Sequence, residues 1–226
     1  MPDPALHEIA SFDEVDRDGA IRESAAAVHG DTRADLFRKG GILAGVGLGI
    51  GGATAGGFAL AKGSAKGDVK ILNYALTLEY LEAAFYAEAN SNGKLNGITA
   101  KFAQVVAAHE AAHVQALQQA LGSKAVKKPS FDFKGTTKAE GSFLKTSMTL
   151  EDTGVSAYQG QAPNIKSGQV LASAGAILAV EARHASWVRD IIGAGKSPVP
   201  APAAFNKPLS MSAVLSAVKG TGFIKS

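Results

Sequence analysis

The sequence predicts an all-α protein whose main domain is a four-helix bundle with one long crossover. Apolar residues recur at three- and four-residue spacing in four stretches of similar length, as amphipathic helices require. The first and second stretches are joined by a short turn, and so are the third and fourth, whereas the middle connection is longer. This order of connections is typical of a bundle in which one link runs the length of the helices.

The chain begins with two segments that lie outside this predicted bundle. Residues 1–39 are polar and charged without a sustained apolar period, which predicts a disordered leader. Residues 40–61 contain no charge and are rich in glycine; they follow Arg38-Lys39 and end in Ala59-Leu60-Ala61. A basic flank, an apolar stretch and a small-residue exit predict an export signal. A retained membrane anchor and a cytosolic glycine-rich arm stay open as alternatives. We therefore expect a periplasmic or cell-envelope protein, with membrane association through this segment if it is retained.

The predicted bundle covers residues 68–193. Asp68 is a candidate N-cap for the first helix, and Gly122 and Gly193 are candidate stops for the second and fourth. The four helices are expected at about 68–90, 99–121, 137–160 and 167–192. Residues 194–226 form a proline-rich tail with a short amphipathic helix expected around 211–219.

Composition excludes several classes of function. The chain has no cysteine, which excludes disulfides, zinc–thiolate sites and cysteine nucleophiles. Residues 62–226 carry a net charge of +7, but sixteen of the eighteen basic residues are lysines spread along the chain. Dispersed lysines are typical of a solvated surface, so no specific nucleic-acid partner is expected. Salt-sensitive DNA binding would be the sign of such a role.

Two Glu-x-x-His motifs carry the candidate chemistry. Glu110 and His113 lie in the second predicted helix, and Glu181 and His184 lie in the fourth. Residues three apart on a helix project from the same face, so each pair can share one metal ion.

An internal repeat adds one carboxylate from each of the other helices. Glu79 lies 31 residues before Glu110, and Glu151 lies 30 residues before Glu181. Each is followed seven residues later by a tyrosine, Tyr86 or Tyr158. Glu82, one turn after Glu79, is the rival in the first helix, and the matching tyrosine favours Glu79. Tyr86, Tyr158 and Glu82 are the candidates for a supporting role around the ligands.

The complete set predicts a dinuclear metal site. Two lone glutamates and two Glu-x-x-His motifs are the ligand set of ferritin-like di-iron and di-manganese proteins. Any one of these residues alone could lie on the surface or pack in the core. Several of them stand in apolar stretches, where a carboxylate needs a cation or a proton. We therefore expect two divalent ions, iron or manganese, with these ligands: Glu79, Glu110, His113, Glu151, Glu181 and His184.

These motifs resemble the bacterial ferritin-like domain family that includes the desiccation-related proteins. The resemblance is carried by NYALTLEYLEAAFY at 73–86, EAAH at 110–113, LEDTGVSAY at 150–158 and VEARHA at 180–185. By analogy with ferritins, it implies that Glu110 and Glu181 bridge the ions and that the other four ligands are terminal. Members commonly carry twin-arginine export signals. Here Thr32-Arg33-Ala34 departs from that motif, because Ala34 stands where the second arginine would be, so the export route stays open.

Two functions follow from this resemblance. The first is an oxidoreductase of ferroxidase or peroxide-scavenging type, with metal ions and oxygen or peroxide as partners. The second is a non-enzymatic stress- or desiccation-related envelope protein whose site is structural or stores metal. The sequence assigns no catalytic residue and leaves open whether the chain forms a homodimer.

Overall fold

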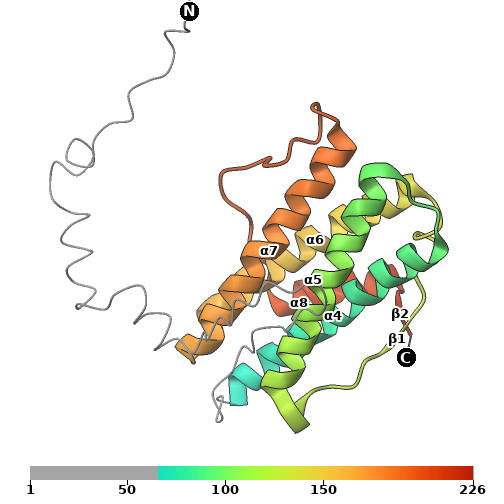
Figure 1. Cartoon of the computed structure of the whole chain (residues 1–226). Coiled ribbons are helices and arrows are strands. Elements are labelled where there is room, and N and C mark those ends of the chain that lie inside the picture. The colour runs from blue at the N-terminus through green and yellow to red at the C-terminus, as the bar shows by residue number, and fades with distance from the viewer. Residues whose placement is uncertain (1–65, 226) are drawn as a thin grey trace, which may run out of the picture. The chain divides into compact units, whose positions relative to one another are not determined.

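The computed structural model describes residues 66–225, and these residues are mostly helical (Figure 1). They form five α-helices, two single-turn 3₁₀ helices and two short strands. The elements in chain order are α4 (Lys66–Asn92), α5 (Gly97–Leu121), η1 (Gly122–Lys124), β1 (Ser130–Phe131), α6 (Glu140–Gln161), η2 (Ala162–Asn164), α7 (Gly168–Gly193), α8 (Met211–Thr221) and β2 (Ile224–Lys225).

The four long helices form the predicted bundle. Helix α4 packs mainly against α5, and α6 packs mainly against α7. Short connections join the helices within each pair, whereas residues 122–139 cross from α5 to α6 along the bundle (Figure 1). The prediction of an all-α four-helix bundle with one long crossover is confirmed.

Two helix starts differ from the predictions. Asp68 does not cap α4, because it lies inside the first turn, fully buried. Its carboxylate accepts the backbone N–H groups of Lys166 and Ser167, each at 2.9 Å, and so ties the start of α4 to the loop before α7. Helix α6 begins at Glu140 instead of near Thr137. The Thr137 hydroxyl is buried and donates to Glu88 at 2.6 Å, which holds the preceding turn against α4.

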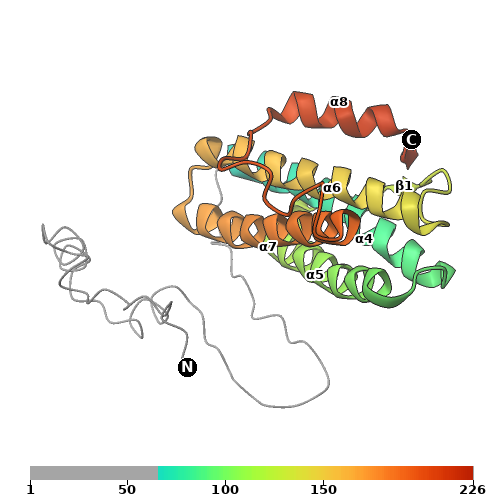
Figure 2. The ribbon, with the colours of Figure 1, turned by 90° about the horizontal axis from the view of Figure 1, so that it is seen from above.

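The tail folds back onto the bundle. Its backbone crosses α6 at Gly160, where a Cβ atom would lie 1.7 Å from the Leu209 carbonyl oxygen, so only glycine permits this approach. Helix α8 lies over α4 and α6, with Val214 and Val218 buried (Figure 2). Strand β2 then pairs antiparallel with β1 of the crossover. The short tail helix was predicted from sequence, whereas the strand pairing was not.

Two apolar clusters fill the bundle on either side of a polar layer. The first is rich in aromatic rings and includes Phe85, Phe102 and Phe143. The second is mostly aliphatic and includes Leu117 and Val170. Along α5, Phe102 and Val106 belong to the first cluster and Leu117 and Leu121 to the second, with 110–113 between them. The Glu-x-x-His motifs therefore lie at mid-height in the bundle, between the two apolar clusters.

Within residues 66–225, no helix has both the length and the hydropathy needed to span a bilayer. The leader predicted at 1–39 and the glycine-rich segment predicted at 40–61 lie outside the described residues.

Candidate metal centre

The structure brings all six predicted ligands together in the middle of the bundle. They come from all four long helices, with one glutamate each on α4 and α6 and a Glu-x-x-His pair each on α5 and α7. The four glutamates are fully buried, and His184 is 2% exposed. The set consists of Glu79, Glu110, His113, Glu151, Glu181 and His184.

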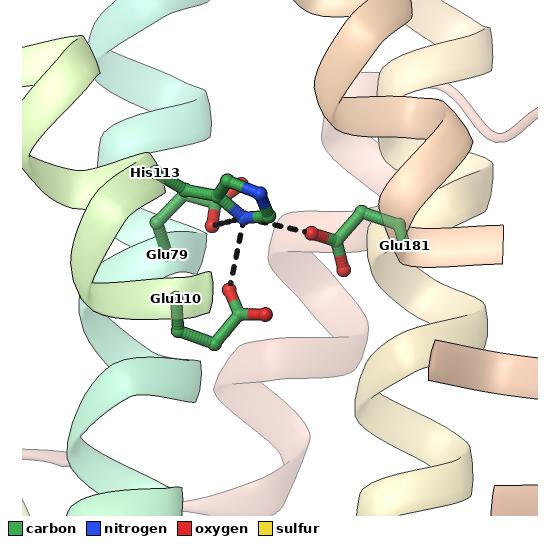
Figure 3. A group of neighbouring side chains, drawn as sticks. All are labelled: Glu79, Glu110, His113 and Glu181. Carbon is green, nitrogen blue, oxygen red and sulfur yellow. Dashed lines mark hydrogen bonds and ion pairs between the residues drawn. The ribbon is translucent and has the colours of Figure 1, made fainter. Parts of the chain in front are cut away.

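One half of this set surrounds the His113 imidazole (Figure 3). His113 Nδ1 lies 3.2 Å from Glu79 Oε2, 3.4 Å from Glu110 Oε2 and 3.0 Å from Glu181 Oε1. One ligand atom from each of these four residues lies within 4.8 Å of every other. They form the first ligand group.

The other half surrounds His184. Its Nδ1 lies 3.2 Å from Glu110 Oε1, 3.2 Å from Glu151 Oε2 and 3.8 Å from Glu181 Oε2. These four residues form the second ligand group, whose ligand atoms also lie within 4.8 Å of one another. Glu110 and Glu181 belong to both groups, each through different oxygens. Two neighbouring cations, one in each ligand group, would share the Glu110 and Glu181 carboxylates and would use both oxygens of each.

Several of the candidate ligand atoms lack a hydrogen-bond partner, as expected of atoms that bind metal ions. Both oxygens of Glu110, both oxygens of Glu181, Glu151 Oε2 and His184 Nδ1 are buried without a hydrogen bond. Buried polar atoms that lack a hydrogen bond are costly, and a cluster of carboxylates repels itself unless cations are present. Carboxylate and imidazole donors suit iron and manganese.

Two tyrosine hydroxyls hold the outer carboxylates. The Tyr158 hydroxyl donates to Glu79 Oε1 at 2.5 Å, and the Tyr86 hydroxyl donates to Glu151 Oε1. Each tyrosine thus donates its hydrogen bond to the glutamate of the opposite repeat, and not to the glutamate seven residues before it. In both cases the other oxygen of the carboxylate faces an imidazole. These bonds fix the orientation of the two terminal carboxylates.

Family comparison agrees with this geometry. Residues 67–194, more than half of the chain, match the family model described as a ferritin-like domain. The chain belongs to the ferritin-like domain family. No curated protein matches it.

The electrostatics of the ferritin-like domain show how its site holds protons when metal is absent. Although burial opposes it, the surrounding carboxylates raise the pKa of His113 well above its usual range and raise the pKa of His184 to about 12. Burial raises the pKa of Glu151 to about 7, and burial together with the Glu181 carboxylate raises the pKa of Glu110 well above its usual range. Glu181 is the exception: burial works against ionisation, but the two imidazoles lower its pKa to about 2. Without metal, two imidazolium groups supply the positive charge.

Metal uptake is therefore expected to release protons. An imidazole nitrogen must lose its proton before it binds a cation, so loading two ions at neutral pH should release at least about two protons. Because the folded-state pKa of both histidines is raised, they stay charged across neutral pH, and affinity should increase from about pH 6 to about pH 8. Titration calorimetry in buffers of different ionisation enthalpy measures the released protons. Uptake without proton release would contradict binding through these imidazoles.

Glu82 stands beside the ligand groups and belongs to neither. It is 3% exposed, and burial, followed by the Glu181 carboxylate, raises its pKa well above the usual range. A Cβ atom at Gly154 would lie in ordinary van der Waals contact with both Glu82 Oε1 and Glu181 Oε2, at 3.4 Å from each, so both carboxylates lie against the same point of α6. Of the two rivals in the first helix, Glu79 joins a ligand group and Glu82 lies next to the site.

His109 is the residue in the ferritin-like domain that sequence reasoning missed. It directly precedes Glu110 and points about 100° away from it on the helix, so the sequence predicts a surface or packing residue and no part in the site. It is exposed, yet its Nδ1 lies 2.8 Å from Nε2 of the buried His184. No spacing rule connects these two positions, because they lie on different helices and 75 residues apart.

Proposed function

We propose that this protein is a dinuclear iron or manganese oxidoreductase that oxidises ferrous iron with dioxygen or peroxide. The observation that carries the proposal is the pair of ligand groups that share Glu110 and Glu181. Two metal ions bound side by side would supply one-electron redox chemistry and reaction with oxygen. On this proposal Glu110 and Glu181 would be ligands at both positions, Glu79 and His113 would complete one position, and Glu151 and His184 would complete the other.

The side chains around the site support redox chemistry over simple storage. Tyr86 and Tyr158 are buried and donate to terminal carboxylates, so they hold those carboxylates while the charge of the site changes. Burial, followed by the carboxylates, raises the pKa of both phenols, which keeps them protonated donors. Apolar clusters lie above and below the site, and its four glutamates are fully buried, which limits the access of water to them.

A small apolar cavity supports dioxygen as the oxidant. It has a volume of about 30 Å³ and lies between α4, α5, α6 and α7, lined by residues that include Leu72, Leu117, Val170 and Ile177. Tyr158 also lines it and connects it to Glu79. Apolar cavities stay dry and accept apolar gases. This one has room for about two water-sized molecules, which suits dioxygen better than an organic substrate.

The test is aerobic oxidation of ferrous iron by metal-free protein that lacks residues 1–61. Ferrous ion is added under nitrogen, air is admitted, and ferric absorbance is followed. We expect an initial rate more than about 10-fold above buffer, with about two electrons passing to each dioxygen. The matched control is Glu140→Gln, which changes an exposed glutamate in the first turn of α6 and should oxidise iron as the wild type does.

Other outcomes separate the alternatives. Oxidation no faster than in buffer, combined with a metal-dependent rise in melting temperature, favours the non-enzymatic stress or storage role. Faster consumption of hydrogen peroxide than of dioxygen makes peroxide the oxidant. The export layout of residues 40–61 supports a cell-envelope location, which fractionation of the host cell tests.

A further inference from the structure

The two ligand groups differ in the contact that each imidazole makes on the side away from the carboxylates. His184 of the second ligand group makes a hydrogen bond through Nε2 with His109 Nδ1 at 2.8 Å. The two rings also stack, with centroids 5.1 Å apart and planes 16° from parallel. His109 is exposed on α5, whereas His184 is 2% exposed on α7. The exposed imidazole of His109 thus supports the buried imidazole of His184 on the side away from the carboxylates.

This contact decides which nitrogen of His184 faces the site. Nδ1 is the nitrogen that lies among the carboxylates. When Nδ1 binds a cation, the one ring proton is on Nε2, so Nε2 donates a hydrogen bond and His109 Nδ1 accepts it. The same bond persists whether Nδ1 holds a proton or a cation, so the ring need not turn when metal replaces the proton.

The first ligand group has no such support. Within residues 66–225, no hydrogen bond to His113 Nε2 is found, and the His113 side chain is 11% exposed. The repeat explains the difference. Val180 precedes Glu181 as His109 precedes Glu110, so the second motif has an apolar residue at the equivalent position. Valine has no side-chain atom that could accept a hydrogen bond from an imidazole.

We propose that His109 is a positioning residue for the second ligand group and makes the two cation positions unequal. The ring of His184 is already fixed, so it loses little rotamer or tautomer freedom when its Nδ1 binds an ion. The ring of His113 is not fixed in this way and loses that freedom on binding. The position formed with Glu151 and His184 therefore binds its ion more tightly and fills first. This inference rests on the proposed metal centre and does not depend on turnover.

The experiment is a titration of metal-free protein with Mn(II), in which the electron paramagnetic resonance signal of free Mn(II) reports binding. Wild type should show two unequal sites. His109→Ala should weaken the tighter site about 10- to 100-fold and leave the weaker one unchanged. His109→Asn retains a carbonyl acceptor and should restore part of the loss. Val180→Ala, at the equivalent position of the other motif, is the matched control and should change neither site.

Background variants assign the affected position. Glu79→Gln disables the first ligand group, and in that background His109→Ala should weaken the remaining site. Glu151→Gln disables the second ligand group, and in that background His109→Ala should have no effect. Because His109 is exposed, the melting temperature of the metal-free protein should stay the same.

Three results would overturn the inference. Equal loss at both sites together with a lower melting temperature assigns His109 a structural role. Wild-type affinities in His109→Ala show that the contact does not position His184. No Mn(II) binding by wild type removes the proposed metal centre itself, and that failure is distinct from the first two because it appears before any substitution.

Discussion

Glu181→Gln is expected to abolish the binding of both metal ions, with a loss of affinity of at least about 100-fold at each position. Glu181 belongs to both ligand groups, through Oε1 near His113 and Oε2 near His184. Glutamine keeps the shape of the side chain and removes the charge that both ions share. Glu110→Gln should act in the same way. Glu79→Gln and Glu151→Gln should each remove one ion, because each residue belongs to one group.

Metal content after dialysis against Fe(II) or Mn(II) measures these differences directly. Glu140→Gln provides the comparison, since it also replaces a glutamate on a bundle helix but an exposed one. Circular dichroism of each metal-free variant checks that the helices remain. A folded Glu181→Gln protein that still holds two ions would contradict a shared carboxylate between the two positions.

The second large effect is on stability. Ferrous or manganous ion should raise the melting temperature of the bundle by about 10 °C. At one site, free metal at about 1,000 times its dissociation constant stabilises the folded state by about 4 kcal/mol, and a domain of this size gains about 2–4 °C for each kcal/mol, so the tighter site alone accounts for this rise. The folded chain offers a complete ligand set, whereas the unfolded chain scatters it over four helices.

Calorimetric scans with and without metal measure this shift under nitrogen, so that iron stays reduced. Calcium and magnesium should raise the melting temperature less, because imidazole favours transition metals over these cations. Glu181→Gln should lose most of the shift. An equal shift in that variant would place the stabilising ions elsewhere on the protein.

The sequence predicted the bundle correctly, and the six ligands it proposed are side chains that the structure brings together, for a physical reason. Helical periodicity and the i, i+3 geometry are local, so the Glu-x-x-His pairs could be placed on helix faces without a structure. The duplicated spacing then identified Glu79 and Glu151, which the structure places opposite the two imidazoles. Four helices with one crossover leave few ways to bury those faces together.

The features that sequence reasoning missed depend on contacts between distant segments. The crosswise bonds of Tyr86 and Tyr158 join opposite halves of the repeat. The His109–His184 contact joins α5 to α7. Asp68 has the composition of an N-cap, but its carboxylate bonds to the backbone before α7, 98 residues later. None of these pairings has a local signal, because each is decided by how the helices rotate and pack.

Anomalous diffraction from a crystal soaked in Mn(II) tests the central claim most directly. Two peaks are predicted between the four long helices, one beside His113 and Glu79, the other beside His184 and Glu151, with Glu110 and Glu181 between them. A single peak, or peaks only on the outer surface of the bundle, would contradict a dinuclear centre.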